Sequence, residues 1–141
     1  MKVDIYVFRQ EDLLEEDASL SLGWLSFKDK GVEISLFREG MCMIFITLTS
    51  LLEAIKKLED KGEKKIKWVG EDNGAVIQFF LEKDNLWMSI GDFSFILRFK
   101  DFKKEIVDAI YKFKNDCVSK NESIAKESAF KDLDLIIKKF I

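Results

Sequence analysis

The sequence predicts an α+β fold with two antiparallel four-stranded meanders, each followed by a helix (ββββα-ββββα), and one more helix at the end. Three observations lead to this prediction. Short apolar or alternating segments are separated by turn residues, as in antiparallel sheets. Three longer segments repeat apolar residues at helical spacing. The second half of the chain also repeats the pattern of the first.

The first half supplies four predicted strands and one helix. The strands cover residues 2–8, 22–28, 32–36 and 41–48. The last is almost entirely apolar and is expected at the centre of its sheet. Gly31 suits the positive φ of a short hairpin loop, and the hydroxyl of Thr47 or Thr49 can cap the following helix. The buried stripe of that helix comprises Leu51, Leu52, Ile55 and Leu58.

The second half supplies four more predicted strands and two helices. The strands cover residues 64–69, 75–81, 86–90 and 93–99. Asn73-Gly74, between the first two of these strands, is a strong hairpin signal. Asp101 is expected to cap a long helix whose buried stripe begins at Phe102. A last helix is expected from about Glu122 to Phe140.

These elements are expected to form one domain, residues 1–141, because no linker rich in Pro, Gly or Ser separates the halves. The domain can also be divided into two pseudo-repeats, residues 1–62 and 63–120, and a C-terminal helix, residues 121–141. In that division Phe27 aligns with Phe79, and the apolar faces of the strands agree. A gene duplication and two independent uses of a meander packed on a helix both predict this pattern.

The charge balance bears on the class of partner. The chain has 23 basic and 26 acidic residues and a net charge of −3, which argues against a general affinity for nucleic acid. Residues 1–40 contain nine acidic and only five basic residues. An acidic region of this kind favours a basic partner.

The N-terminal residues are too charged for a signal peptide, and no apolar run approaches the roughly 20 residues of a membrane span. We therefore expect a cytoplasmic protein that does not bind a membrane. Cys42 and Cys117 are expected to be small buried hydrophobic residues in a reducing compartment.

The chain carries no recognisable catalytic set. It has no histidine, which removes Ser-His and Cys-His nucleophile pairs and imidazole metal ligands. Two distant cysteines do not make a usual zinc site, and no Gly-rich loop is placed to hold a phosphate. We therefore expect neither enzymatic activity nor a cofactor or metal. Catalysis by carboxylates alone is the remaining alternative, and it would need buried or closely paired acids.

Acidic residues form the first candidate binding site. Most lie in the segment 10–17, which we predict to be a loop with at most one helical turn, and two follow Trp68. The candidate residues are Glu11, Asp12, Glu15, Glu16, Asp17, Glu71 and Asp72. They are either a solvated surface or a docking surface whose charge speeds the encounter with a basic partner.

A basic and aromatic cluster forms the second candidate site. Its residues are Lys64, Lys65, Lys67 and Trp68. Lysines beside a stacking ring can bind single-stranded nucleic acid, whereas lysines on an edge strand can simply prevent pairing with other chains. Trp87 lies opposite the buried face of its strand, and we expect it to contact another layer of the core. An exposed Trp87 would instead suit a binding hot spot.

Two groups of proteins resemble this chain. The order ββββα-ββββα, with junctions such as Ile46-Thr47-Leu48-Thr49, resembles the single-strand-binding proteins of the Whirly and Pur type. This resemblance covers topology only, and it implies single-stranded nucleic acid as the partner.

The stretch from LTSLLEAIKKLEDKG through WVGEDNGAVIQFFLEKDNLWMSIGDFSF resembles the helix and meander of some small bacterial toxin-immunity proteins of contact-dependent or polymorphic toxin systems. Many of these are acidic α+β proteins without catalytic motifs. The resemblance implies a protein-binding inhibitor that sequesters and neutralises a cognate toxin domain. This is the leading functional hypothesis from the sequence, and a single-stranded nucleic-acid-binding protein is the alternative.

Overall fold

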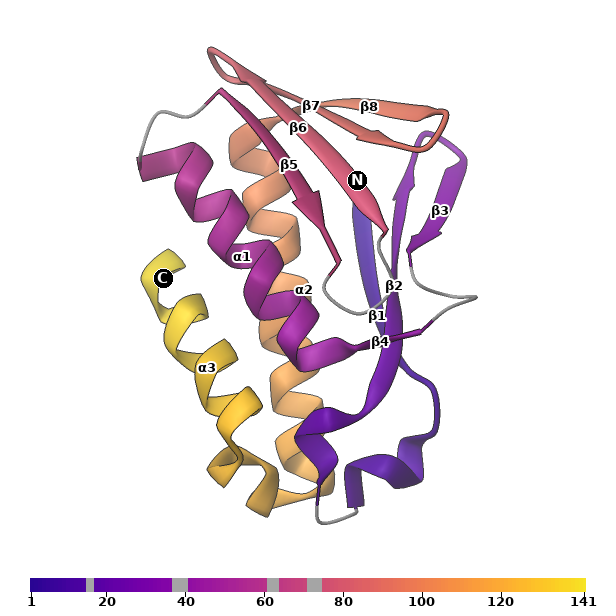
Figure 1. The fold of residues 1–141 in the computed structure, drawn as a ribbon, viewed down its shortest axis with the longest axis vertical. Helices are drawn as coiled ribbons and strands as arrows, with labels where there is room; N and C mark the ends of the chain where they lie inside the picture. The colour runs from indigo at the N-terminus through magenta and orange to yellow at the C-terminus, as the bar shows by residue number, and fades with distance from the viewer. Residues whose placement is uncertain (15–16, 37–40, 61–63, 71–74) are drawn as a thin grey trace.

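The computed structural model describes residues 1–14, 17–36, 41–60, 64–70 and 75–141. Within this part of the chain, two four-stranded antiparallel sheets and three α-helices surround one hydrophobic core. Sheet B lies across the top of Figure 1, sheet A stands at the right, and α1 and α2 descend beneath sheet B. The α+β class and the two antiparallel sheets were predicted correctly.

Sheet A contains β1 (Lys2–Val7), β2 (Leu22–Asp29), β3 (Val32–Leu36) and β4 (Cys42–Met43). β1 pairs with one side of β2 along its whole length. The other side of β2 pairs with β3 over its second half and with β4 at its start. Sheet A is therefore not the simple four-stranded meander that the sequence predicted. The loop between β2 and β3 was predicted correctly, since Gly31 has a φ of 83°.

Sheet B contains β5 (Lys65–Val69), β6 (Val76–Glu82), β7 (Asn85–Ile90) and β8 (Phe93–Arg98). These strands pair in chain order, β5-β6-β7-β8, so the predicted meander is confirmed here. Tight turns at Lys83-Asp84 and Gly91-Asp92 join the last three strands. Gly91 has a φ of 57°, a conformation that glycine adopts at little cost.

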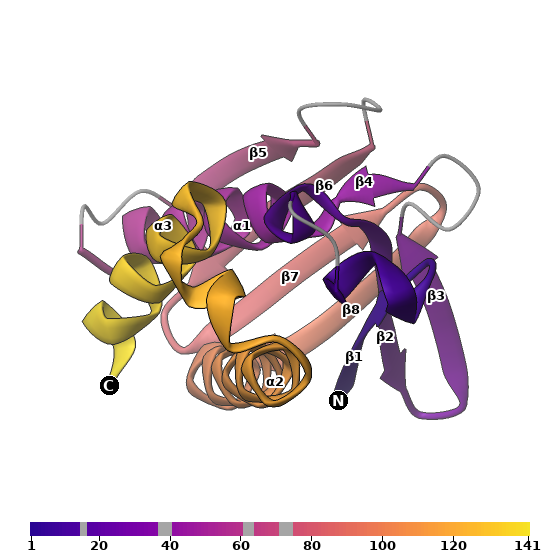
Figure 2. The same cartoon turned by 90° about the horizontal axis from the view of Figure 1, so that it is seen from below.

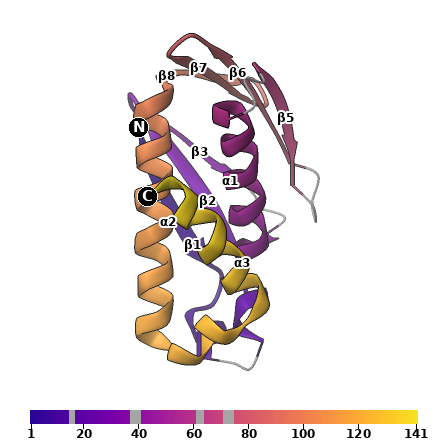
Figure 3. The ribbon, with the colours of Figure 1, turned by 90° about the vertical axis from the view of Figure 1, so that its left-hand side faces the viewer.

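The α-helices are α1 (Ile44–Asp60), α2 (Phe99–Lys120) and α3 (Ser128–Ile137). Four 3-10 helices lie among the described residues: η1 (Gln10–Leu14), η2 (Ala18–Leu20), η3 (Glu122–Lys126) and η4 (Lys138–Phe140). α3 packs along α1, and α2 packs along β1. Figure 3 shows α1 and α2 side by side beneath sheet B, with α3 crossing between them lower down.

The predicted central strand over residues 41–48 is wrong beyond Met43, because α1 already begins at Ile44. Ile44, Phe45 and Leu48 are fully buried and lie on one face of the helix. A short apolar run of this kind fits a buried strand and a buried helix equally well. Because α1 starts early, Thr47 and Thr49 lie inside it and neither caps it. The Thr49 hydroxyl instead donates to the carbonyl of Phe45 at 2.9 Å.

Two other helix boundaries differ from the prediction. α2 begins at Phe99, so Asp101 lies in its first turn, where a carboxylate favours the helix dipole without capping the helix. The predicted last helix divides into η3, α3 and η4. Asn121 begins this region, and its side chain accepts a hydrogen bond from the Ser123 backbone N–H at 3.2 Å. Side-chain competition of this kind favours caps and turns over a continuous helix.

Aromatic rings connect the layers of the core. The Phe102 ring, on α2, lies 6.4 Å from Phe27 of β2 and 6.1 Å from Phe79 of β6, measured between centroids. Phe27 and Phe79, which align with each other in the division into pseudo-repeats, therefore contact the same helix. In another part of the core, the Phe45 ring of α1 lies 5.4 Å from Phe113 of α2 and 5.9 Å from Phe130 of α3, measured between centroids. The core thus joins both sheets and all three α-helices.

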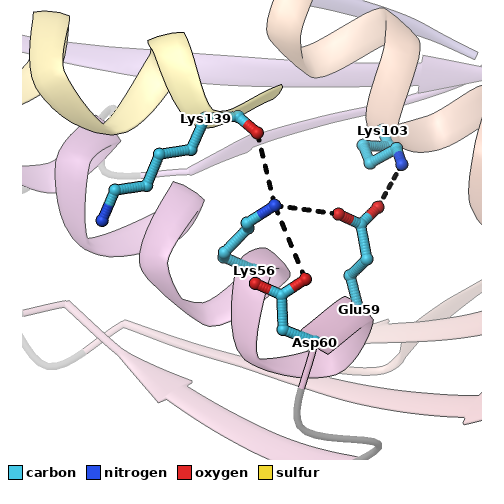
Figure 4. A network of polar contacts seen from close by, with 5 residues as sticks. All are labelled: Lys56, Glu59, Asp60, Lys103 and Lys139. Atoms are coloured by element: carbon cyan, nitrogen blue, oxygen red, sulfur yellow. Dashed lines mark hydrogen bonds and ion pairs between the residues drawn. The ribbon is translucent and has the colours of Figure 1, made fainter. Parts of the chain in front are cut away.

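Both cysteines are buried, as predicted, and burial raises the pKa of the Cys117 thiol to about 12. Polar contacts at the surface connect the helices to one another. Figure 4 shows Glu59 of α1 accepting hydrogen bonds from Lys56 and from Lys103 of α2. Lys56 also donates to the backbone carbonyl of Lys139 at 3.3 Å. Glu59 therefore connects α1 with α2, and Lys56 connects α1 with the C-terminal segment.

Replacing Glu59 with glutamine is expected to lower the free energy of unfolding by about 1 kcal/mol near neutral pH. The hydrogen bond from Lys103 holds the pKa of Glu59 below its ordinary value of 4.5 in the folded state. The stabilisation is therefore present above that ordinary value and is lost as the pH falls through the lower folded value. Urea unfolding at about pH 7 and about pH 3 should show a smaller pH dependence in Glu59→Gln than in the wild type. Glu53→Gln, an exposed position on the same helix, is the control.

Candidate binding surfaces

Sheet A carries a cluster of apolar side chains on its outward face, three of them exposed and one partly buried. We call it the sheet A patch, and it consists of Tyr6, Phe8, Leu22 and Trp24. Tyr6 and Trp24 are cross-strand partners whose rings stack with centroids 5.2 Å apart. The Phe8 backbone N–H donates to the Leu22 carbonyl at 2.8 Å, which places these two residues side by side. Phe8 is 53% exposed, Leu22 40% and Tyr6 39%, whereas Trp24 is partly buried and packs against the core.

The alternation of the strands explains why these residues face outward. Val3, Val7, Leu25 and Phe27 point into the core, so the residues between them on β1 and β2 point the other way. The helices α1, α2 and α3 lie on the inward side of sheet A (Figure 2). An outward face of an antiparallel sheet is normally polar, whereas this one carries three aromatic rings and a leucine. The patch is therefore a candidate interface.

The acidic segment, residues 10–17, adjoins this patch in the chain, because η1 begins two residues after Phe8. Glu11 and Asp17 are exposed. Asp12 is only partly exposed and pairs with Arg9, with 3.1 Å between a guanidinium nitrogen and a carboxylate oxygen. Four other predicted acidic residues, Glu15, Glu16, Glu71 and Asp72, lie outside the described residues. Among the described members of the set, Glu11 and Asp17 are thus the unpaired acids.

The C-terminal half of the chain holds the acidic segment in place. The Asn121 side-chain amide donates to the Leu13 carbonyl at 2.8 Å, and Leu13 itself is buried. In η2, just after the segment, the Ser19 backbone N–H donates to a carboxylate oxygen of Glu127 at 2.8 Å. Lys120 also donates to the Gln10 side chain. η1 and η2 are consequently attached to the end of α2 and to the chain that follows it, by long-range contacts that no local pattern predicts.

Sheet B carries a second candidate surface, which we call the sheet B face. The strand register aligns its outward residues in rows that cross the sheet. One row is Lys65, Phe80, Trp87 and Ile96, and the next is Lys67, Gln78, Ser89 and Ser94. A third contains Glu82, Asn85 and Arg98. The helices lie below the sheet, so no described helix covers this face (Figures 1 and 3).

The predicted basic and aromatic cluster is only partly preserved on this face. Lys64, Lys65 and Lys67 are exposed. Trp68, however, points inward: it is 5% exposed, and its indole N–H donates to the Ser50 hydroxyl at 2.9 Å. Trp68 therefore cannot act as an exposed stacking ring. Trp87 is 42% exposed, so the expectation that it would lie in the core was wrong. The alternation of β7 indicated its outward direction, but whether another layer covered it could not be read from the sequence.

The described residues contain no group of three or more Cys, Asp and Glu side chains that could hold a metal ion. Among the carboxylates that the structure describes, Glu59 and Asp134 have clearly shifted pKa values, and hydrogen bonds from lysines lower both values. A general acid needs the opposite shift. Among the described helices, none is long and apolar enough to cross a membrane.

Comparison with protein-family models, with curated proteins and with solved structures finds no match to this chain. The two candidate surfaces are therefore interpreted from their own geometry.

Proposed function

We propose that this chain is a cytoplasmic protein-binding inhibitor of the toxin-immunity kind, and that it sequesters a bacterial toxin domain through the sheet A patch. The observation that carries the proposal is the Tyr6 ring, exposed beside Phe8 and Leu22 on an outward sheet face and stacked on the partly buried Trp24. Contiguous exposed apolar residues of this kind mark interaction sites on soluble proteins.

The residue types of the patch suit a protein partner. Tyrosine and tryptophan are enriched among the residues that dominate binding energy at protein interfaces. Each ring offers a large contact area, and burying it against a partner removes apolar surface from water. Because Tyr6 and Trp24 already stack on each other on two paired strands, little side-chain freedom remains to be lost on binding.

The acidic segment adds an electrostatic contribution at one edge of the patch. Glu11 and Asp17 are exposed there, and Asp12 is paired with Arg9. Rim charges of this kind speed diffusional encounter more than they lengthen the lifetime of a complex. A basic toxin domain, such as one that acts on nucleic acid, has the complementary charge. The inhibitor would act by covering the toxin's active surface, which requires affinity and no chemistry from this chain.

The experiment uses the full chain and each protein encoded next to it. We expect one of these proteins to be toxic when produced alone, to be tolerated with this chain, and to bind it in biolayer interferometry. Phe8→Ala and Trp24→Ala should each weaken the affinity by about thirtyfold, since a hot-spot residue contributes about 2 kcal/mol. Leu135→Ala, which removes a leucine that is 64% exposed on α3, should leave the affinity unchanged.

Substitutions of the charged residues are expected to change the rate of association instead of the rate of dissociation. Glu11→Lys together with Asp17→Lys should slow association several-fold at low salt and leave dissociation nearly unchanged. The proposal is wrong if no neighbouring protein binds, or if Leu135→Ala weakens binding as much as the two patch variants do. Circular dichroism of each variant separates a loss of binding from a loss of folding.

A further inference from the structure

We propose that the sheet B face binds single-stranded nucleic acid, as an activity separate from the sheet A patch. The ligand class follows from the side chains that the strand register aligns. A row with an aromatic centre runs beside a row of amide and hydroxyl groups, and cations lie on both sides. Exposed bases, ribose or deoxyribose, and phosphates require these three kinds of partner.

The aromatic row supplies the stacking surface. Trp87 lies between Phe80 and Ile96 on the neighbouring strands and exposes 42% of its surface. The ammonium group of Lys65 lies 5.4 Å from the centroid of the Phe80 ring, so a cation borders the same row. A depression of about 450 Å³ opens beside Trp87, between Lys65, Lys67, Gln78 and Ser89. A base stacked on Trp87 would therefore have polar groups within reach of its edge.

The charge of the face is complementary to phosphate. Its outward cations are Lys65, Lys67 and Arg98, and its single outward carboxylate in the described strands is Glu82. None of the three cations forms an ion pair with another described residue. Their charge is therefore available to a ligand. A second copy of the chain would bring the same cations into contact with each other, which argues against self-association through this face.

The positive region continues past the end of the sheet. Arg98 also borders a cavity of about 520 Å³, whose other charged residues are Lys83, Lys100, Lys103, Asp84 and Asp101. Lys103 is engaged with Glu59. Lys83 and Lys100 extend the row of cations beyond Arg98, and the two aspartates reduce but do not reverse the positive charge. A strand of several nucleotides would thus find cations along its length.

The test uses fluorescence anisotropy with labelled oligo-dT and oligo-U of about twelve nucleotides, the length that such a platform accommodates. Binding by the full chain should weaken with salt, with a slope of about −2 in log K against log[NaCl], as three phosphate contacts predict for a single strand. Duplex DNA of the same length should bind more weakly, because its bases cannot stack on Trp87.

Matched variants separate the contribution of the lysines to binding from that of Trp87. Lys65→Glu with Lys67→Glu should weaken binding at least tenfold, whereas Lys112→Glu with Lys131→Glu makes the same change of charge on α2 and α3 and should have little effect. Trp87→Ala should weaken binding about tenfold, and Trp87→Phe should restore most of it by keeping a ring. These variants leave the sheet A patch intact, so toxin binding should not change.

Three results would overturn the inference. One is the absence of oligonucleotide binding by the wild type at low salt. Another is an equal loss in the two lysine pairs, which would indicate a general charge effect. The third is equally tight binding of poly-glutamate, because the face would then accept acidic protein segments. None of these results bears on the sheet A patch, so the proposed inhibitor function can stand or fall independently.

Discussion

Replacing Phe102 with alanine is expected to destabilise the protein by about 4 kcal/mol, the cost of removing a buried phenylalanine and leaving a cavity. Phe102 is 1% exposed, and its ring contacts Phe27 of sheet A and Phe79 of sheet B. The cavity would open where the two sheets share α2, so the neighbouring layers cannot collapse into it without moving a sheet. Urea unfolding followed by circular dichroism measures the loss.

Two further substitutions test whether the loss of stability in Phe102→Ala comes from the buried position of the ring. Phe102→Leu keeps most of the apolar volume and should cost about 1.5 kcal/mol. Phe93→Ala removes an equal ring from a position that is 52% exposed and should cost well under half of the Phe102→Ala value. Similar losses for Phe93→Ala and Phe102→Ala would contradict the assignment of Phe102 as the residue that connects the sheets.

Replacing Gly23 with alanine is expected to cost about 3 kcal/mol, because the added methyl group has no room. A Cβ atom at Gly23 would overlap the Tyr6 carbonyl oxygen and would lie 3.3 Å from the Cβ of Ile44. Gly23 pairs with Val7 on one side and Cys42 on the other, so both neighbours are backbone-bonded strands that resist displacement. Thermal and urea unfolding measure the change.

Gly91→Ala provides the comparison for Gly23→Ala. No atom lies within 4 Å of a Cβ at Gly91, but its φ of 57° is unfavourable for alanine. The expected cost is therefore only the conformational one, about 1 kcal/mol. If Gly91→Ala were the more destabilising of the two, steric exclusion at the junction of β1, β2 and β4 would not be the reason for glycine at position 23.

The sequence predicted sheet B better than sheet A, for a physical reason. The turns of sheet B are short and its strands alternate, so neighbours in the chain become neighbours in the sheet. In sheet A, β4 pairs with β2 instead of β3, and α1 replaces most of the expected fourth strand. The run Ile44–Leu48 is apolar except for Thr47, and a run this short does not show by periodicity whether it forms a strand or a helix. The surrounding tertiary structure decides between them.

The candidate surfaces were predicted only in part. The alternation of residues along β7 predicted that Trp87 points away from the buried face of its strand. The lysines of β5 were also placed correctly on a surface. Local patterns could not show that Trp68 would point inward and bond to Ser50. The two faces of β5 become inward and outward only through its packing against α1. The sheet A patch was missed because Tyr6 and Phe8 appeared as the less apolar face of β1, and their contact with Leu22 and Trp24 depends on strand pairing.

The bond between Asn121 and Leu13 has a consequence for synthesis of the chain. These residues lie 108 positions apart, as do Ser19 and Glu127. During translation the N-terminal residues leave the ribosome first, at about 5–20 residues per second, and wait several seconds for their partners. The region beside Phe8 can thus reach its final form only after residues 121–127 have emerged. A nascent chain that stalls before that point would display aromatic side chains on an unsupported strand, and chaperones recognise such surfaces.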